Sequence, residues 1–86
     1  MNINDLIAIV KRKLLDKIEI QKIDIEDKSF LHKNHSGHQK GKFHLKLIIN
    51  SVELKKANRI ESYKRIYKVL DQELKKHIHS LQILIS

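Results

Sequence analysis

Cysteine and tryptophan are absent from this 86-residue sequence, and aromatic residues make up only 5% of it. Without cysteine there is no disulfide framework, no thiolate metal site and no cysteine nucleophile. The core is therefore expected to be aliphatic, built from isoleucine and leucine. No apolar run approaches the roughly 20 residues that span a bilayer, and the amino-terminal residues lack the basic and apolar blocks of a signal peptide. We expect a cytoplasmic protein with no membrane partner.

Length and charge narrow the class further. A chain of 86 residues has room for one domain with one small core. The net charge of +8 favours an anionic partner, such as nucleic acid or an acidic protein surface, although small lysine-rich proteins are often merely soluble. The sequence contains no nucleophile elbow, no phosphate-binding glycine loop and no HExxH motif. Catalysis is not expected.

The amino-terminal third predicts a helix followed by a strand. Asn2 or Asn4 can cap the helix, and Asp5 lies favourably in its first turn. Isoleucines then alternate with charged residues over residues 19–26, which predicts a strand. The alternation changes phase at residues 21–22, which indicates a bulge or a short connector before the strand. The apolar stripe of the helix comprises Ile3, Leu6, Ile7, Val10 and Leu14.

The second half predicts a strand, a short helix, a long helix and a closing strand. Residues 43–49 alternate cleanly, with His44 and Lys46 outward, and most simply pair antiparallel with the first strand. Residues 51–59 can hold a short helical turn, and residues 60–76 predict the long helix, which runs through a hinge at residues 78–79 into the last strand. The residues of this helix expected to face the core are Ile60, Tyr63, Ile66, Tyr67, Val69, Leu70 and Leu74.

This order predicts an α+β fold of αββααβ topology, with a three-stranded mixed sheet and the helices packed on one face. It resembles the type II KH topology, whose members clamp nucleotides with a GXXG loop. Here Gly37 and Gly41 are separated by three residues and lie between the strands, so that mode is weakly supported. A basic surface that follows phosphates is left as the nucleic-acid hypothesis. Its candidate residues are Lys56, Arg59, Lys64 and Arg65.

Residues 27–42 form a long inter-strand loop that contains three histidines, His32, His35 and His38. Imidazoles at this spacing could hold zinc, copper or nickel. The surrounding lysines oppose a dication, and the alternative is a solvated polar loop. The other candidate ligand is His79 at the hinge. Its alternative role is that of a partly buried histidine that hydrogen-bonds a backbone carbonyl.

Three segments of the chain together resemble the BolA family, in the same order and over essentially the whole chain. They are Ile78-His79-Ser80-Leu81 after Glu73-Leu74, then Phe43-His44-Leu45-Lys46, and Asp27-x-Ser29 followed by His32 and His35. The sequence departs from the family pattern where Phe30 replaces the first loop histidine. It departs again where Ser62-Tyr63-Lys64 replaces a basic helix start and where Lys56 stands near a missing glycine.

The resemblance implies one BolA-like domain over residues 1–86 and a non-enzymatic partner of monothiol glutaredoxins. Family members share a [2Fe–2S] cluster with these partners in iron–sulfur assembly, trafficking or iron sensing. The family's ligand histidine falls on His79, and a second ligand comes from the loop, with His32 and His35 preferred. The glutaredoxin would supply its cysteine and a glutathione thiolate, so no cluster is expected on the isolated chain, which would be a monomer or a weak homodimer. The alternatives are a DNA-binding transcriptional regulator and a mononuclear metal carrier.

Overall fold

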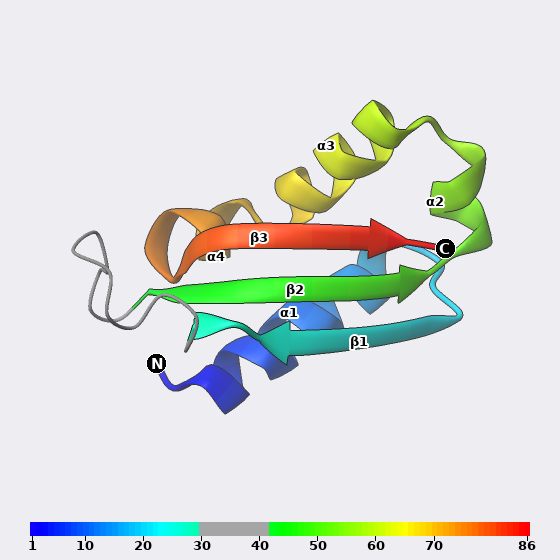
Figure 1. Ribbon diagram of the computed structural model, residues 1–86. Coiled ribbons are helices and arrows are strands. Elements are labelled where there is room, and N and C mark those ends of the chain that lie inside the picture. Colours follow the sequence, from blue (N-terminus) through cyan, green and yellow to red (C-terminus); the bar gives the residue numbers. More distant parts are fainter. Residues whose placement is uncertain (30–41) are drawn as a thin grey trace.

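The computed structural model describes residues 1–29 and 42–86, which form a three-stranded sheet with helices on one of its faces (Figure 1). The sheet has the strand order β1-β2-β3. β1 (Lys22–Asp27) pairs antiparallel with the central strand β2 (Phe43–Asn50). β3 (Ile78–Ile85) pairs parallel with β2 on the other side. The predicted αββααβ order and mixed sheet are confirmed.

The first helix, α1 (Ile3–Lys17), is capped by Asn2 rather than by Asn4. The side-chain oxygen of Asn2 accepts a hydrogen bond of 2.8 Å from the backbone N–H of Asp5. This bond satisfies one of the amides that the first helical turn leaves unpaired. The residues of the predicted stripe that become fully buried lie four apart and are Leu6, Val10 and Leu14.

The first strand begins three residues later than the alternation predicts, at Lys22 instead of residue 19. Ile18 is buried, but it ends α1 instead of opening the strand. The sequence allowed either a bulge or a short connector before the strand, and the structure has a short connector between α1 and β1. It is tied to the sheet because the N–H of Gln21 donates to the carbonyl of Asn50 at 2.9 Å.

The short helix α2 (Val52–Lys56) is attached to that connector through Ser51. The Ser51 hydroxyl donates to the carbonyl of Glu19 at 2.7 Å and accepts from the N–H of Leu54 at 3.1 Å. One buried side chain thus caps α2 and joins it to the chain that follows α1.

The predicted long helix is divided into α3 (Arg59–Val69) and α4 (Asp71–Lys76) at Leu70, where φ is −99° and ψ is 16°. The expectation that Ile60 and Tyr67 face the core is wrong, because they are 68% and 42% exposed. The core face of α3 instead carries a serine, because its hydroxyl donates to the carbonyl of Leu54 at 2.7 Å and so tolerates burial. The buried positions from α3 through Leu70 are Ser62, Ile66 and Leu70.

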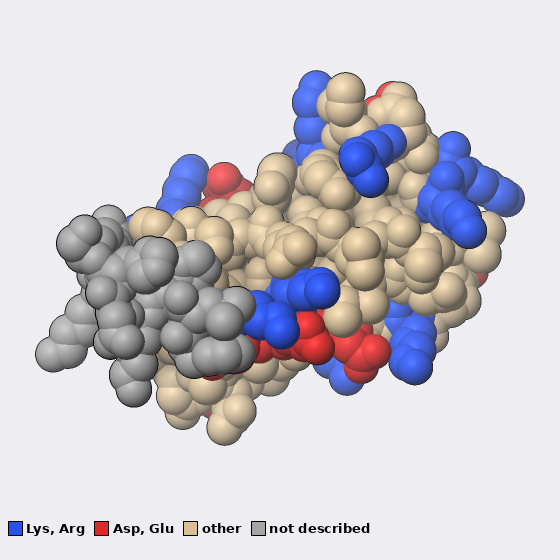
Figure 2. Space-filling model, in the orientation of Figure 1, with Lys and Arg blue, Asp and Glu red and all other residues tan. Residues whose placement is uncertain are grey.

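The core lies between the helices and the sheet. Leu45, Leu47 and Ile49 of β2 are buried on the helix side, and Leu47 lies between Ile25 and Ile83 of the flanking strands. Alternate residues of the strands face the other side of the sheet, which Figure 2 shows. Among the helices within residues 1–29 and 42–86, none combines the length and apolar character needed to cross a membrane.

Candidate functional site

His79 lies at the start of β3, and its side chain is exposed to solvent. The backbone just before it is held in place, because Ile78 is buried and the carbonyl of His77 accepts a hydrogen bond of 2.9 Å from the N–H of Phe43. The alternative of a partly buried histidine at this position is therefore wrong. The ring is presented at the surface from an anchored strand.

The exposure of His79 follows from an irregularity in the pairing of β2 and β3. Phe43 lies opposite Ile78, whereas the next residue of β2, His44, lies opposite Ser80. His79 is therefore an extra residue on β3 with no partner on β2, which is the pattern of a β-bulge. Because a bulge interrupts the alternation of the strand, Ile78 stays buried while the next two side chains both reach solvent.

A second imidazole lies directly beside His79. The ring centroids of His44 and His79 are 4.9 Å apart, and the ring planes are inclined by 57°. The Nδ1 atom of His44 lies 2.6 Å from Oγ of Ser80, within hydrogen-bond distance. His44 faces away from the helices, as predicted, but it is not a solvated side chain, because only 6% of it is exposed. Its bond to Ser80 satisfies a polar atom in this covered position.

The predicted loop ligands lie outside the described residues. His32, His35 and His38, and also Phe30, belong to residues 30–41. Within residues 1–29 and 42–86, no group of three or more histidine, cysteine, aspartate or glutamate side chains is arranged to hold a metal ion. The described part of the chain therefore brings together two imidazoles and not a complete ligand set.

Both ends of the histidine-bearing segment are nevertheless anchored next to His79. At its start, the hydroxyl of Ser29 accepts a hydrogen bond of 3.0 Å from the N–H of His44. At its end, Phe43 donates to His77, as described above. Ser29 and Phe43, which lie at or next to the two ends of that segment, are therefore bonded to the backbones of His44 and His77.

The four basic residues predicted to contact nucleic acid differ in their surroundings. Lys56, Arg59 and Lys64 are exposed at the end of α2 and along α3. Arg65 forms an ion pair with Glu53, which neutralises part of its charge. Lysine and arginine side chains gather over α2 and the start of α3 on the face shown in Figure 2, whereas acidic side chains gather over β1. The exposed cations thus form a surface separate from His79.

The family follows from a match that spans most of the sequence. Residues 14–86 match the family model described as BolA-like protein. The chain belongs to the BolA family. Members of the BolA family are non-enzymatic, in agreement with the lack of catalytic motifs in this sequence.

Individual BolA proteins resemble this chain in sequence and in structure. The protein named DNA-binding transcriptional regulator BolA from Haemophilus influenzae is 29% identical over 75 residues, which cover 87% of this chain and 70% of that protein. BolA1 from Arabidopsis thaliana has a similar structure, with a TM-score of 0.75, 26% identity, and coverage of 92% of this chain and 87% of that one. The BolA domain of SufE1 from the same plant has a TM-score of 0.77 at 24% identity and covers 100% of this chain and 93% of that one. The BolA fold is thereby confirmed.

Sequence reasoning singled out His79 but missed its contact with His44 and the hydrogen bond between His44 and Ser80. The signal that could have found them is the outward position of both His44 and Ser80 on strands that turn out to be neighbours. Alternation shows which face a residue occupies, but it does not show the register of two parallel strands. The bulge that aligns His44 with Ser80 is a property of that register.

Proposed function

We propose that this BolA-family chain is a cytoplasmic, non-enzymatic adaptor that partners a monothiol glutaredoxin carrying glutathione. In this role it ligates a shared [2Fe–2S] cluster through His79, in iron–sulfur cluster assembly or trafficking or in iron sensing. The observation that carries the proposal is the exposed imidazole on the bulge at the start of β3. A ligand that must reach iron in a second protein has to be accessible in this way.

The donors that the chain offers fit the chemistry of such a cluster. Imidazole can replace thiolate on one iron of a [2Fe–2S] centre and raises its reduction potential. The sequence contains no cysteine but six histidines, so it has no thiolate to offer the cluster, whereas it has several imidazoles. When bound, the cluster supplies one-electron redox chemistry. We propose His32 or His35 as the second ligand, because the segment that carries them begins and ends beside His79.

The residues around His79 that the structure describes fix the position and the orientation of its ring. The buried side chain of Ile78 anchors the strand immediately before the ligand. The ring of His44 lies against the ring of His79 and is itself held by Ser80. Outer contacts of this kind restrict how a ligand ring can turn and are a common part of metal sites. The arrangement offers the exposed imidazole of His79 as a nitrogen donor.

The test is a titration of cluster-loaded monothiol glutaredoxin, with glutathione present, followed by visible absorption and circular dichroism. Wild-type protein should change both spectra until a stoichiometric end point, and His79→Ala should abolish the change. His77→Ala is the matched control, since His77 lies two residues earlier at the end of α4. It should behave as wild type. The proposal is overturned if wild-type protein leaves the spectra unchanged, or if His79→Ala produces the full spectral change.

A DNA-binding regulator is the second candidate function. It is favoured by the exposed lysines and arginine on α2 and α3 and by the name of the Haemophilus influenzae relative, DNA-binding transcriptional regulator BolA. Contacts to phosphates predict an affinity that falls steeply as the salt concentration rises, and regulation also requires discrimination among sequences. Fluorescence anisotropy on several duplexes at two salt concentrations measures both. Weak and equal binding to all duplexes would remove this candidate.

A further inference from the structure

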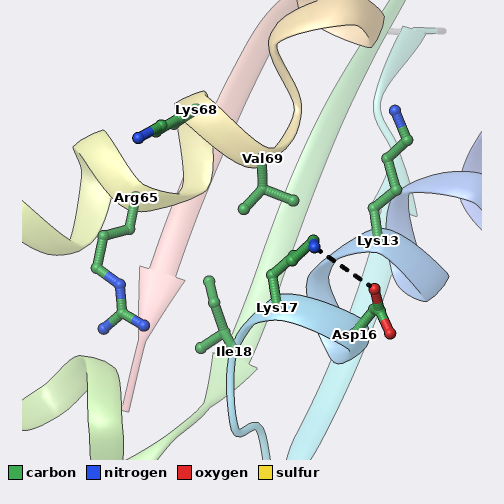
Figure 3. Close-up of a pocket in the computed structure, with 7 residues that line it drawn as sticks. All are labelled: Lys13, Asp16, Lys17, Ile18, Arg65, Lys68 and Val69. Carbon is green, nitrogen blue, oxygen red and sulfur yellow. Dashed lines mark ion pairs between the residues drawn. The ribbon is translucent and has the colours of Figure 1, made fainter.

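A groove of about 660 Å³ lies between the last turns of α1 and α3 (Figure 3). None of the residues that line it belongs to β2 or β3. Each helix contributes three side chains at positions i, i+3 and i+4, which share one face of a helix. The two sets of residues line the groove from α1 and from α3. The lining residues are Lys13, Asp16, Lys17, Ile18, Arg65, Lys68 and Val69.

The residues that line the groove keep a net positive charge after their ion pairs are counted. Four of the lining residues are basic and one is acidic. Two of the basic side chains have acidic partners outside the groove, since Lys13 pairs with Glu73 and Arg65 pairs with Glu53. Lys17 reaches Asp16 only at 4.0 Å, with both side chains exposed, so this pair is weak. Lys68 forms no ion pair within residues 1–29 and 42–86.

Complementing the helix dipoles accounts for only part of this arrangement. A basic residue in the last turn of a helix offsets the partial negative charge there, which suffices for Lys17 on α1 and Lys68 on α3. It does not explain why the two helix ends stand side by side around an apolar floor. That floor is formed by Val69 and the edge of Ile18, which is only 4% exposed, and the aliphatic stems of the lysines extend it.

We propose that this groove is a docking site for an acidic, amphipathic helical segment of a partner protein. Its apolar side chains would pack on Ile18 and Val69, and its carboxylates would meet Lys17 and Lys68 on opposite sides, which is recognition of a helix in a groove with complementary charge. Single-stranded nucleic acid is disfavoured, because none of the lining residues is aromatic and the floor gives the bases nothing on which to stack.

The site is distinct from His79 and does not depend on the proposed glutaredoxin role. None of its lining residues takes part in the contacts among His44, His79 and Ser80. An adaptor with this arrangement can hold an acidic partner on its helices while the start of β3 is engaged elsewhere. The groove therefore assigns a second interaction surface to the chain.

The test uses ¹⁵N-labelled full-length protein and a synthetic peptide of roughly 14 residues, about four helical turns, with leucines on one face and glutamates elsewhere. Saturable amide shifts should appear at Lys17, Ile18, Lys68 and Val69. The double substitution Lys17→Glu with Lys68→Glu should weaken binding about tenfold, as expected for reversing two rim charges. The matched control, Lys55→Glu with Lys56→Glu, changes the net charge equally on α2 and should leave the affinity within about twofold.

Three outcomes would overturn the proposal. The first is an absence of saturable shifts with wild-type protein. The second is equal weakening in both double variants, which would reduce the effect to net charge. The third is a mixed-sequence DNA duplex that shifts the same amides more strongly, which would make the groove a nucleic-acid surface. A scrambled peptide whose leucines do not share a face should bind more weakly, because the apolar floor then has no matching stripe.

Discussion

Nδ1 of His44 and Oγ of Ser80 lie 2.6 Å apart on neighbouring strands, directly beside the exposed ring of His79. This contact exists because the bulge at His79 moves Ser80 into register with His44. A covered polar ring, its hydroxyl partner and an exposed ring thus form one small cluster. The cluster makes the orientation of the proposed ligand sensitive to a side chain that is not itself a ligand.

Replacing Ser80 by alanine removes the hydroxyl from Nδ1 of His44. We expect the free energy of unfolding to fall by about 1 kcal/mol, because a polar atom of a buried side chain loses a hydrogen bond. Urea denaturation measures the change. Ser86→Ala, an exposed serine just beyond β3, is the control and should leave the stability unaltered. Equal stability of Ser80→Ala and wild type would show that the contact contributes nothing.

The ion pair between Lys13 and Glu73 supports a second prediction. Glu73 is buried, its Oε2 lies 2.8 Å from Nζ of Lys13, and its Oε1 has no hydrogen-bond partner within the described residues. Lys13→Met should lower the free energy of unfolding by about 1–2 kcal/mol, because it leaves a buried carboxylate without its cation. The partial exposure of Lys13 limits this loss.

The double variant Lys13→Met with Glu73→Leu serves as the control for this pair. Replacing both charges by apolar groups removes the unpaired carboxylate, so the double variant should be more stable than Lys13→Met alone. Thermal denaturation of the wild type and the two variants compares them. A double variant that is less stable than the single one would contradict the assigned cause.

Leu47 lies at the centre of the sheet and is fully buried. Leu47→Ala should lower the free energy of unfolding by roughly 2–5 kcal/mol, since it removes packed methyl groups and leaves a cavity. Leu84 on β3 is exposed and provides the matched control, where the same truncation should change stability by less than about 0.5 kcal/mol. Chemical denaturation measures the free energy of unfolding of both variants. Similar decreases in Leu47→Ala and Leu84→Ala would contradict the assignment of Leu47 to the core.

Asn58 begins α3 by accepting a hydrogen bond of 2.9 Å from the N–H of Glu61. Asn58→Ala should destabilise the protein by about 1 kcal/mol, because an amide of the first turn loses its acceptor. Asn58→Asp keeps a side-chain acceptor and should stay close to wild type. Circular dichroism during thermal unfolding gives both values, and an alanine variant as stable as the aspartate variant would rule out the capping role.

Prediction from the sequence succeeded where a local period carries the information. The alternation of residues 43–49 identified β2, and the three- and four-residue spacing of the amino-terminal stripe identified α1. It failed where a polar residue takes a core position. Ser62 is buried because it has a hydrogen-bond acceptor in α2, whereas Ile60 is left exposed, and neither fact follows from helical spacing.

The site was accessible from the sequence only in part. The resemblance pointed to His79, but the residues alone also allowed a partly buried histidine there. The exposure of the ring depends on the bulge, and the bulge depends on how β2 and β3 pair across a long separation in the chain. The loop residues His32 and His35 stay predictions.

By itself the sequence determined the kinds of element and their order, because hydrophobic period and capping residues act over a few neighbours. It also determined that this chain offers no cysteine thiolate to iron, because cysteine is absent. Only the tertiary structure decided that His79 stands exposed against His44 and that two helix ends enclose a cationic groove. Both depend on register and packing between distant segments, which no local pattern encodes.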